Sequence, residues 1–153
     1  MCEKIGKPEI KRKMAQKGFL LVSGTANSFG MRYIEPGAFE WMEMADIYRR
    51  SPYVRLSRLA SGEVTTQQIT EPAAEVEVNE AFRDEAEGVS VSTTVIRVRS
   101  TGEVLAEASR ATFSGGRTKW VLGAWGSASC PSGMNEGEEF RQYYKLVELT
   151  LAK

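Results

Sequence analysis

Three carboxylates spaced three residues apart are the part of this sequence best suited to chemistry. Glu40, Glu43 and Asp46 lie within residues 38–50 (AFEWMEMADIYRR), where the wealth of Met, Ala and Glu and the lack of Gly and Pro predict a helix. Steps of three residues would place the three carboxylates on one side of that helix. Because the rest of the segment is apolar, we expect burial, which raises the pKa of a carboxylate and suits it to act as a general base. The alternative is an ordinary solvent-facing stripe of an amphipathic helix.

The absence of histidine narrows the chemistry further. Histidine is the side chain that most often serves as a general base near neutral pH and is a common metal ligand. None occurs among the 153 residues, which excludes Ser-His-Asp, Cys-His and histidine-based zinc sites within this chain. Cys2 and Cys130 form neither a C-x-x-C motif nor a disulfide framework. We therefore expect no metal site and no bound cofactor.

Composition predicts a folded domain without a nucleic-acid partner. Hydrophobic residues make up 42% of the chain, and 20 basic residues balance 20 acidic ones. No apolar run approaches the length of a membrane span or a secretion signal, so we expect a cytoplasmic protein with no membrane contact.

Charge is nevertheless segregated along the chain. The first 17 residues are mainly basic, whereas residues 71–87 are mainly acidic. We predict a mobile basic leader over residues 1–17 and a single α+β domain over residues 18–153. An alternative is that the leader docks on an acidic partner, such as a carrier protein or a second subunit.

The rest of the sequence predicts the strands that must position the carboxylates. Alternating or apolar β-rich segments predict strands at residues 19–26, 64–70, 74–82, 89–99, 103–113 and 119–124. Thr101 and Gly102 predict a tight turn. Residues 136–153 favour a helix, although Val147, Leu149 and Leu151 also alternate as in a strand. One strand, one central helix and a run of antiparallel strands together predict an α+β fold.

Two stretches carry a family resemblance. Residues 28–46 (SFGMRYIEPGAFEWMEMAD) follow a motif of the form His-Phe-Pro-x-x-Pro-[Val/Ile]-Met-Pro-Gly and the helix after it; the matching positions are Phe29, Ile34, Pro36, Gly37, Met44 and Ala45. Residues 89–113 are similar to the last strand pair of the same family. Together they resemble the hotdog fold, in its 3-hydroxyacyl-carrier-protein dehydratase branch. The resemblance implies a single central helix wrapped by a curved antiparallel sheet, an acyl thioester beside that helix, and a homodimer. The alternative architecture is a cone- or barrel-shaped antiparallel β fold with flanking helices.

The departures from the family motif bear on activity. The dehydratase histidine falls on Ser28 and its carboxylate on Met42, and neither residue can supply acid or base for dehydration. Hotdog thioesterases use a helix Asp or Glu instead, which makes Glu43 the first candidate general base and Asp46 the second. The residues expected to contact the thioester are Asn27, Ser28, Gly37, Ala38, Trp41 and Met42. Their alternatives are turn chemistry for Asn27 and Ser28, and plain core packing for Trp41 and Met42.

These residues leave three functions open. The first is binding of acyl-CoA or acyl-carrier-protein thioesters, with hydrolysis by a carboxylate. The second is a non-catalytic subunit that binds acyl groups or supports an active partner. The third is a β-barrel carrier of a small apolar ligand.

Overall fold

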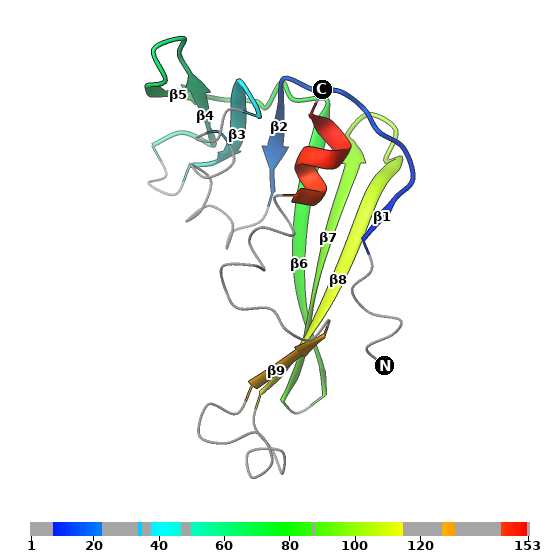
Figure 1. Ribbon diagram of the computed structural model, residues 1–153. Helices are drawn as coiled ribbons and strands as arrows, with labels where there is room; N and C mark the ends of the chain where they lie inside the picture. Colours follow the sequence, from blue (N-terminus) through cyan, green and yellow to red (C-terminus); the bar gives the residue numbers. More distant parts are fainter. Residues whose placement is uncertain are drawn as a thin grey trace.

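The computed structural model of the chain describes residues 8–22, 34, 38–46, 50–86, 88–114, 127–130 and 145–152. It is a mixed α+β fold in which a curved sheet is accompanied by a C-terminal helix at residues 145–151 (Figure 1). The strands are β1 (Glu9–Ile10), β2 (Gly18–Leu21), β3 (Trp41–Ala45), β4 (Tyr53–Arg58), β5 (Val64–Ile69), β6 (Val76–Ala86), β7 (Val89–Val98), β8 (Val104–Ser114) and β9 (Ser127–Cys130). The predicted α+β class is confirmed.

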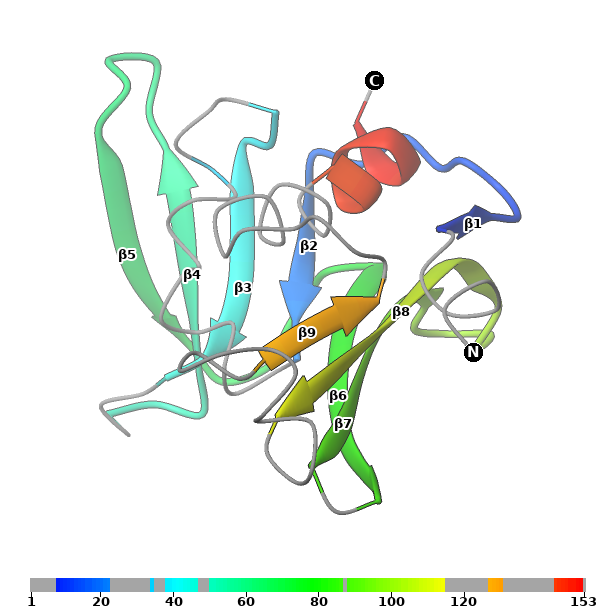
Figure 2. The same cartoon turned by 60° about the horizontal axis from the view of Figure 1, so that its bottom comes forward.

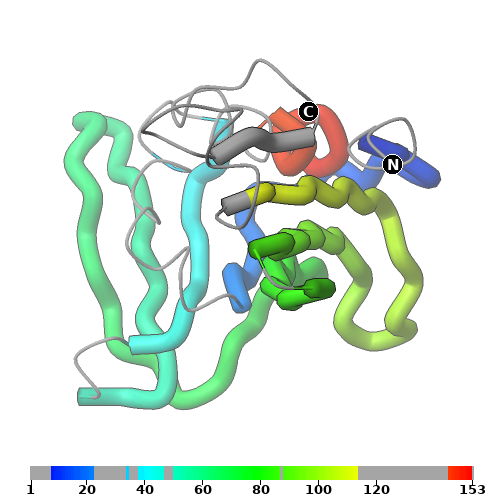
Figure 3. Tube along the Cα trace, turned by 90° about the horizontal axis from the view of Figure 1, so that it is seen from below, coloured from blue at the N-terminus to red at the C-terminus, as the bar shows by residue number. Residues whose placement is uncertain are grey.

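The strand order explains how the sheet is connected. The described strands follow the order β1-β8-β7-β6-β2-β3-β4-β5, and β9 pairs with β8 (Figure 2). Most pairs are antiparallel, but β2 runs parallel to both of its neighbours, β3 and β6. The connection from β5 to β6 must therefore pass β4, β3 and β2 before it enters the sheet again (Figure 3).

The predicted central helix at residues 38–50 is wrong, because Trp41–Ala45 is strand β3. Its side chains alternate with period two: Met42 and Met44 are buried in the core, and Trp41 and Glu43 point to the opposite face. Pairing with β2 on one side and β4 on the other supplies backbone hydrogen bonds along the strand. Burial between two strands thus overrides the helix propensity of Met, Ala and Glu.

One face of the sheet, which we call the core face, carries the main hydrophobic core; the opposite face is the outer face. Core residues from the sheet include Phe19, Met42, Leu56, Val78 and Ile96. The C-terminal helix adds its own apolar side, made of Leu146, Val147 and Leu151. The preference for helix near the C-terminus is confirmed for residues 145–151, while residues 136–144 lie outside the described part of the chain.

Residues 8–17 are anchored to the domain, which corrects the expectation of a mobile leader for this part. Strand β1 pairs with β8. Lys11 forms an ion pair with Glu107 at 3.0 Å, and Arg12 forms one with Glu103 at 2.6 Å. The backbone N–H of Met14 then donates to the carbonyl of Thr150 at 2.9 Å, so this segment also reaches the C-terminal helix. Basic residues of the leader therefore bind carboxylates of the same chain.

The later strands were well predicted. Strands β5, β7 and β8 begin and end within one residue of the predicted ranges, and β6 starts two residues later and continues to Ala86. Gly102 lies in the predicted turn with φ of 73°, a conformation that glycine adopts readily. The predicted strand at residues 119–124 and most of the predicted connection at residues 27–37 fall outside the described residues. No helix within the described residues has the length and apolar character needed to span a bilayer.

Candidate functional site

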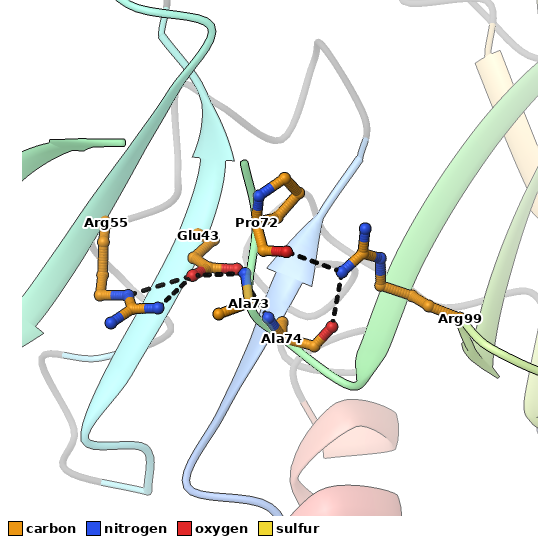
Figure 4. Close-up of polar contacts among 6 residues, drawn as sticks. All are labelled: Glu43, Arg55, Pro72, Ala73, Ala74 and Arg99. Carbon is orange, nitrogen blue, oxygen red and sulfur yellow. Dashed lines mark hydrogen bonds and ion pairs between the residues drawn. The ribbon is translucent and has the colours of Figure 1, made fainter. Parts of the chain in front are cut away.

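Glu43, the first candidate base, is fully buried and surrounded by hydrogen-bond donors. It lies on the outer face of β3, directly opposite Arg55 of β4. The Arg55 guanidinium donates to Glu43 Oε1 through Nε at 3.0 Å and Nη2 at 2.5 Å. The backbone N–H of Ala73 donates to Oε1 at 3.1 Å and that of Ala74 to Oε2 at 2.9 Å (Figure 4). Three of these donors reach Oε1 and one reaches Oε2, so both oxygens of the carboxylate are hydrogen-bonded.

The same donors show what Glu43 does in the fold. Ala73 and Ala74 belong to the connection from β5 to β6, which passes over the outer face at this point. From the other side, Arg99 Nη1 donates to the carbonyls of Pro72 at 3.0 Å and Ala74 at 2.7 Å (Figure 4). Glu43 thus accepts hydrogen bonds from two amides of the connection, and Arg99 donates hydrogen bonds to two of its carbonyls. Ala74 is buried, so its backbone N–H and carbonyl need such partners, and the arrangement is a structural clamp.

Trp41 lies beside this clamp. An added Cβ at Gly18 would lie 2.3 Å from Trp41 Cδ2 and 2.4 Å from the Trp41 carbonyl oxygen, so the indole rests directly on the glycine. The Arg55 guanidinium lies 4.8 Å from the centre of the ring, within cation–π distance. Trp41 therefore packs between strand β2 and the cation that also binds Glu43.

Asp46, the second candidate base, binds the backbone just before β4. Its Oδ2 accepts hydrogen bonds from the backbone N–H groups of Arg50 and Ser51, both at 2.9 Å, and from Ser51 Oγ at 3.3 Å. A side-chain oxygen that accepts from nearby amides is typical of Asp in turns. Asp46 follows β3 directly, so it shares no helix face with Glu43.

The other predicted site residues are scattered. Met42 is fully buried in the core, and Ala38 packs against the core from its edge. Glu40 is exposed and pairs with Lys17 at 3.2 Å. Asn27, Ser28 and Gly37 fall outside the described residues. The structure brings Glu43 and Trp41 together through Arg55, but it places Met42 on the opposite face of the sheet.

A second polar pair, on the core face, was not predicted. Glu80 of β6 and Thr94 of β7 are directly opposite in the register. Glu80 lies two residues after Val78, and Thr94 lies two residues before Ile96. Both of these neighbours are in the main core, so the side chains of Glu80 and Thr94 point to the core face. Thr94 is 2% exposed and its Oγ1 has no hydrogen-bond partner. A buried hydroxyl without a partner is uncommon and indicates a place for a missing polar group.

Glu80 adds an ionisable group to this pair. It is half-buried, and burial raises the pKa of Glu80 above the ordinary value of 4.5. The carboxyl therefore takes up a proton more readily than a surface glutamate. Protonated, it can donate a hydrogen bond as well as accept one. Together, Glu80 and Thr94 can bind a neutral group such as an amide or a carbonyl.

The sequence did contain a signal for this pair. Alternation in β6 places Val76, Val78 and Glu80 on one face, so a carboxylate follows two core valines. The acidic stretch around residues 71–87 hid it, because most of its other carboxylates are exposed or lie on the outer face. The burial of Thr94 could not be predicted from β7 alone, because buried residues lie on both faces of this strand: Val91 on one, and Thr94 and Ile96 on the other.

No group of three or more Cys, Asp or Glu side chains within the described part of the chain is placed to hold a metal ion. Comparisons with protein-family models, with curated proteins and with solved structures gave no match to this chain.

Proposed function

We propose that the protein is a non-catalytic binding protein for a small ligand that has an apolar body and a hydrogen-bonding head. The head would bind beside Glu80 and Thr94 on the core face. The observation that carries the proposal is the buried Thr94 hydroxyl without a partner. An acyl thioester of coenzyme A or of a carrier protein has both parts, because its acyl chain is apolar and its pantetheine arm carries amides.

The contacts of Glu43 and Asp46 favour binding without hydrolysis. A general base must accept a proton from water, and its oxygen must be open to that water. Glu43 is fully buried with four donors, and Asp46 accepts from the backbone N–H groups of Arg50 and Ser51. Releasing Glu43 would leave the buried N–H of Ala74 without this partner, and releasing Asp46 would break two hydrogen bonds to partly buried backbone N–H groups. This supports a carrier or partner subunit over a thioesterase.

The sheet favours the cone- or barrel-shaped alternative over a hotdog architecture. The hotdog resemblance assigns its central helix to the segment that contains β3. A curved sheet with the core on one face resembles a carrier fold, in which a ligand lies against the inner side of the strands.

The surroundings of the polar pair suit a ligand of mixed character. Along β6, Glu80 lies between Val78, which is buried in the core, and Phe82, which is 58% exposed. Ala108 of β8 lies next to Thr94 and packs against the core. A carbonyl at this point would accept from Thr94 Oγ1, and an amide N–H would donate to Glu80. The hydroxyl would thereby gain the partner that the free protein lacks.

Titration calorimetry with decanoyl-CoA tests the proposal. We expect binding, and we expect T94V to weaken it about tenfold because one hydrogen bond to a buried group is lost. T93V is the matched control, because Thr93 is the next residue of β7, lies on the outer face and bonds to Ser109 Oγ at 3.1 Å. T93V should bind like the wild type. Equal affinity of T94V and wild type, or no binding at all, would refute the proposed site.

A thiol-release assay on the same samples tests the absence of catalysis. Decanoyl-CoA should remain intact over hours with the wild-type protein. Hydrolysis that is lost in E43Q, under conditions where E43Q remains folded, would instead assign the protein to the thioesterases.

A further inference from the structure

Strand β5 is the outermost strand at one end of the sheet, and its outer edge differs from the other free edges. No strand among the described residues pairs with that edge. At the opposite end of the order, β1 has only two residues. Strand β6 pairs with β2 only at Glu77 and Val78, and the free edge beyond this pairing carries the charged residues Arg83, Asp84 and Glu85. Shortness and charge both protect sheet edges from pairing with other chains.

Strand β5 has none of these protective features. Its sequence, Val-Thr-Thr-Gln-Gln-Ile, contains no charge and no proline, and its register with β4 is continuous, without a bulge. The four residues between Val64 and Ile69 are all exposed. β-Branched residues are enriched in strands, and an uncharged edge of this kind is a template for another strand.

The backbone hydrogen bonds define which groups of β5 face outward. The N–H of Arg58 donates to the carbonyl of Glu40, so the even-numbered residues of β4 bond to β3. The odd-numbered residues of β4 therefore bond to β5, where their register partners are Thr65, Gln67 and Ile69. The N–H of Leu59, which donates to the carbonyl of Glu63, follows the same alternation. The N–H and carbonyl groups of Val64, Thr66 and Gln68 consequently point away from the sheet.

We infer that β5 pairs with β5 of a second copy of this chain, antiparallel and centred on Thr66. A two-fold axis perpendicular to the sheet places the core faces of the two copies on the same side of the extended sheet. A residue of β5 can therefore pair only with a residue whose side chain lies on the same face. In the register centred on Thr66, the backbone of Thr66 forms hydrogen bonds with Thr66 of the second copy. On either side of this pair, the backbone of Val64 forms hydrogen bonds with Gln68. A register centred on Gln67 would leave the outward groups of Val64 unused.

The side chains in this register are compatible with one another. Thr66 meets its own copy, a Thr–Thr pair of the kind that stabilises neighbouring strands, and Thr65 meets Gln67. No charged residue of β5 is brought opposite a like charge, because β5 has none. A second neutral edge is a better partner than a charged segment of another protein. Pairing with such a segment would remove its charges from water, and β5 has no charged residue to pair with them.

Sedimentation velocity over a range of concentrations tests the inference. The wild-type protein should form dimers. T66K would place two lysines opposite each other at the two-fold axis and raise the dimer dissociation constant at least about tenfold. T65K is the matched control, because its lysine would face Gln67 of the second copy. T65K should remain dimeric.

Mixing variants tests the register itself. T66E alone should be monomeric, like T66K, whereas an equimolar mixture of T66K and T66E should form heterodimers because the two charges are then opposite. Urea unfolding curves identify any variant that has lost its fold. A wild-type monomer at all concentrations, dimers that T66K leaves unchanged, or a mixture that stays monomeric would each overturn the inference. None of these outcomes bears on ligand binding beside Thr94.

Discussion

At the scale of single residues, the contacts of a carboxylate decide its role. Glu43 and Glu80 are both buried to some degree, but Glu43 accepts from Arg55 and two backbone amides, whereas Glu80 is next to a hydroxyl that has no partner. The sequence predicted Glu43 as the reactive one because of its spacing from Glu40 and Asp46. Spacing alone does not reveal how many donors surround an oxygen, and here two of the four donors come from a connection about 30 residues further along the chain.

Replacing Glu43 should therefore affect stability. E43Q removes the charge and turns one acceptor into a donor that faces backbone amides or Arg55. We expect it to lower the free energy of unfolding by about 2–4 kcal/mol, as for other broken buried ion pairs. E40Q is the control, because the exposed pair of Glu40 with Lys17 should contribute less than about 1 kcal/mol. Urea denaturation measures both, and equal stability of E43Q and wild type would refute the clamp.

The raised pKa of Glu80 gives a pH dependence of defined sign. The folded protein holds the proton of Glu80 more tightly than the unfolded chain, whose carboxyl titrates near 4.5. The contribution of this group to stability therefore increases as the pH falls from about 7 towards 4.5, and decreases as the pH rises. E80Q removes this term. The difference in unfolding free energy between wild type and E80Q, measured by urea denaturation at several pH values, should change in favour of the wild type on acidification. A constant difference would contradict the burial of Glu80.

At the scale of elements, β3 shows where local sequence is insufficient. The segment WMEMA contains good helix formers, but it also alternates, with Met42 and Met44 on one side and Trp41 and Glu43 on the other. Whether the segment folds as a helix or as a strand depends on what packs beside it. Here β2 and β4 pair with it on both sides, so it is a strand. Neither the alternation of β7 nor the β-branched residues of β5 compete with a helical pattern, so both strands were predicted closely. The C-terminal helix was predicted because its apolar residues repeat at helical spacing.

The close packing of β2 on β3 gives a prediction for Gly18. G18A would place a methyl group 2.3 Å from the Trp41 ring and 2.4 Å from its backbone oxygen, so the strands must separate. We expect a loss of at least about 2 kcal/mol in the free energy of unfolding. Because the backbone oxygen remains in place, W41A should not restore the stability of G18A. Thermal or urea unfolding checks this, and full rescue by W41A would show that only the ring is obstructed.

At the scale of the whole molecule, the sequence predicted an α+β domain but not its topology. Strand pairing between β2 and β6 joins residues more than 50 positions apart, and the strand order requires the connection from β5 to β6 to cross β4, β3 and β2. Neither follows from alternation, which identifies strands but not their partners. The site beside Thr94 depends on this topology, because the curved sheet determines which face is covered. The same topology leaves β5 at the edge, where a second copy can extend the sheet.

The most direct test of the proposed function follows backbone amides by ¹H–¹⁵N NMR during titration with decanoyl-CoA. We expect chemical-shift changes centred on Glu80, Thr94 and Ala108, reduced in T94V and retained in T93V, with the thioester intact. Shifts centred on Glu43, Arg55 and Ala73, accompanied by release of free thiol, would contradict it.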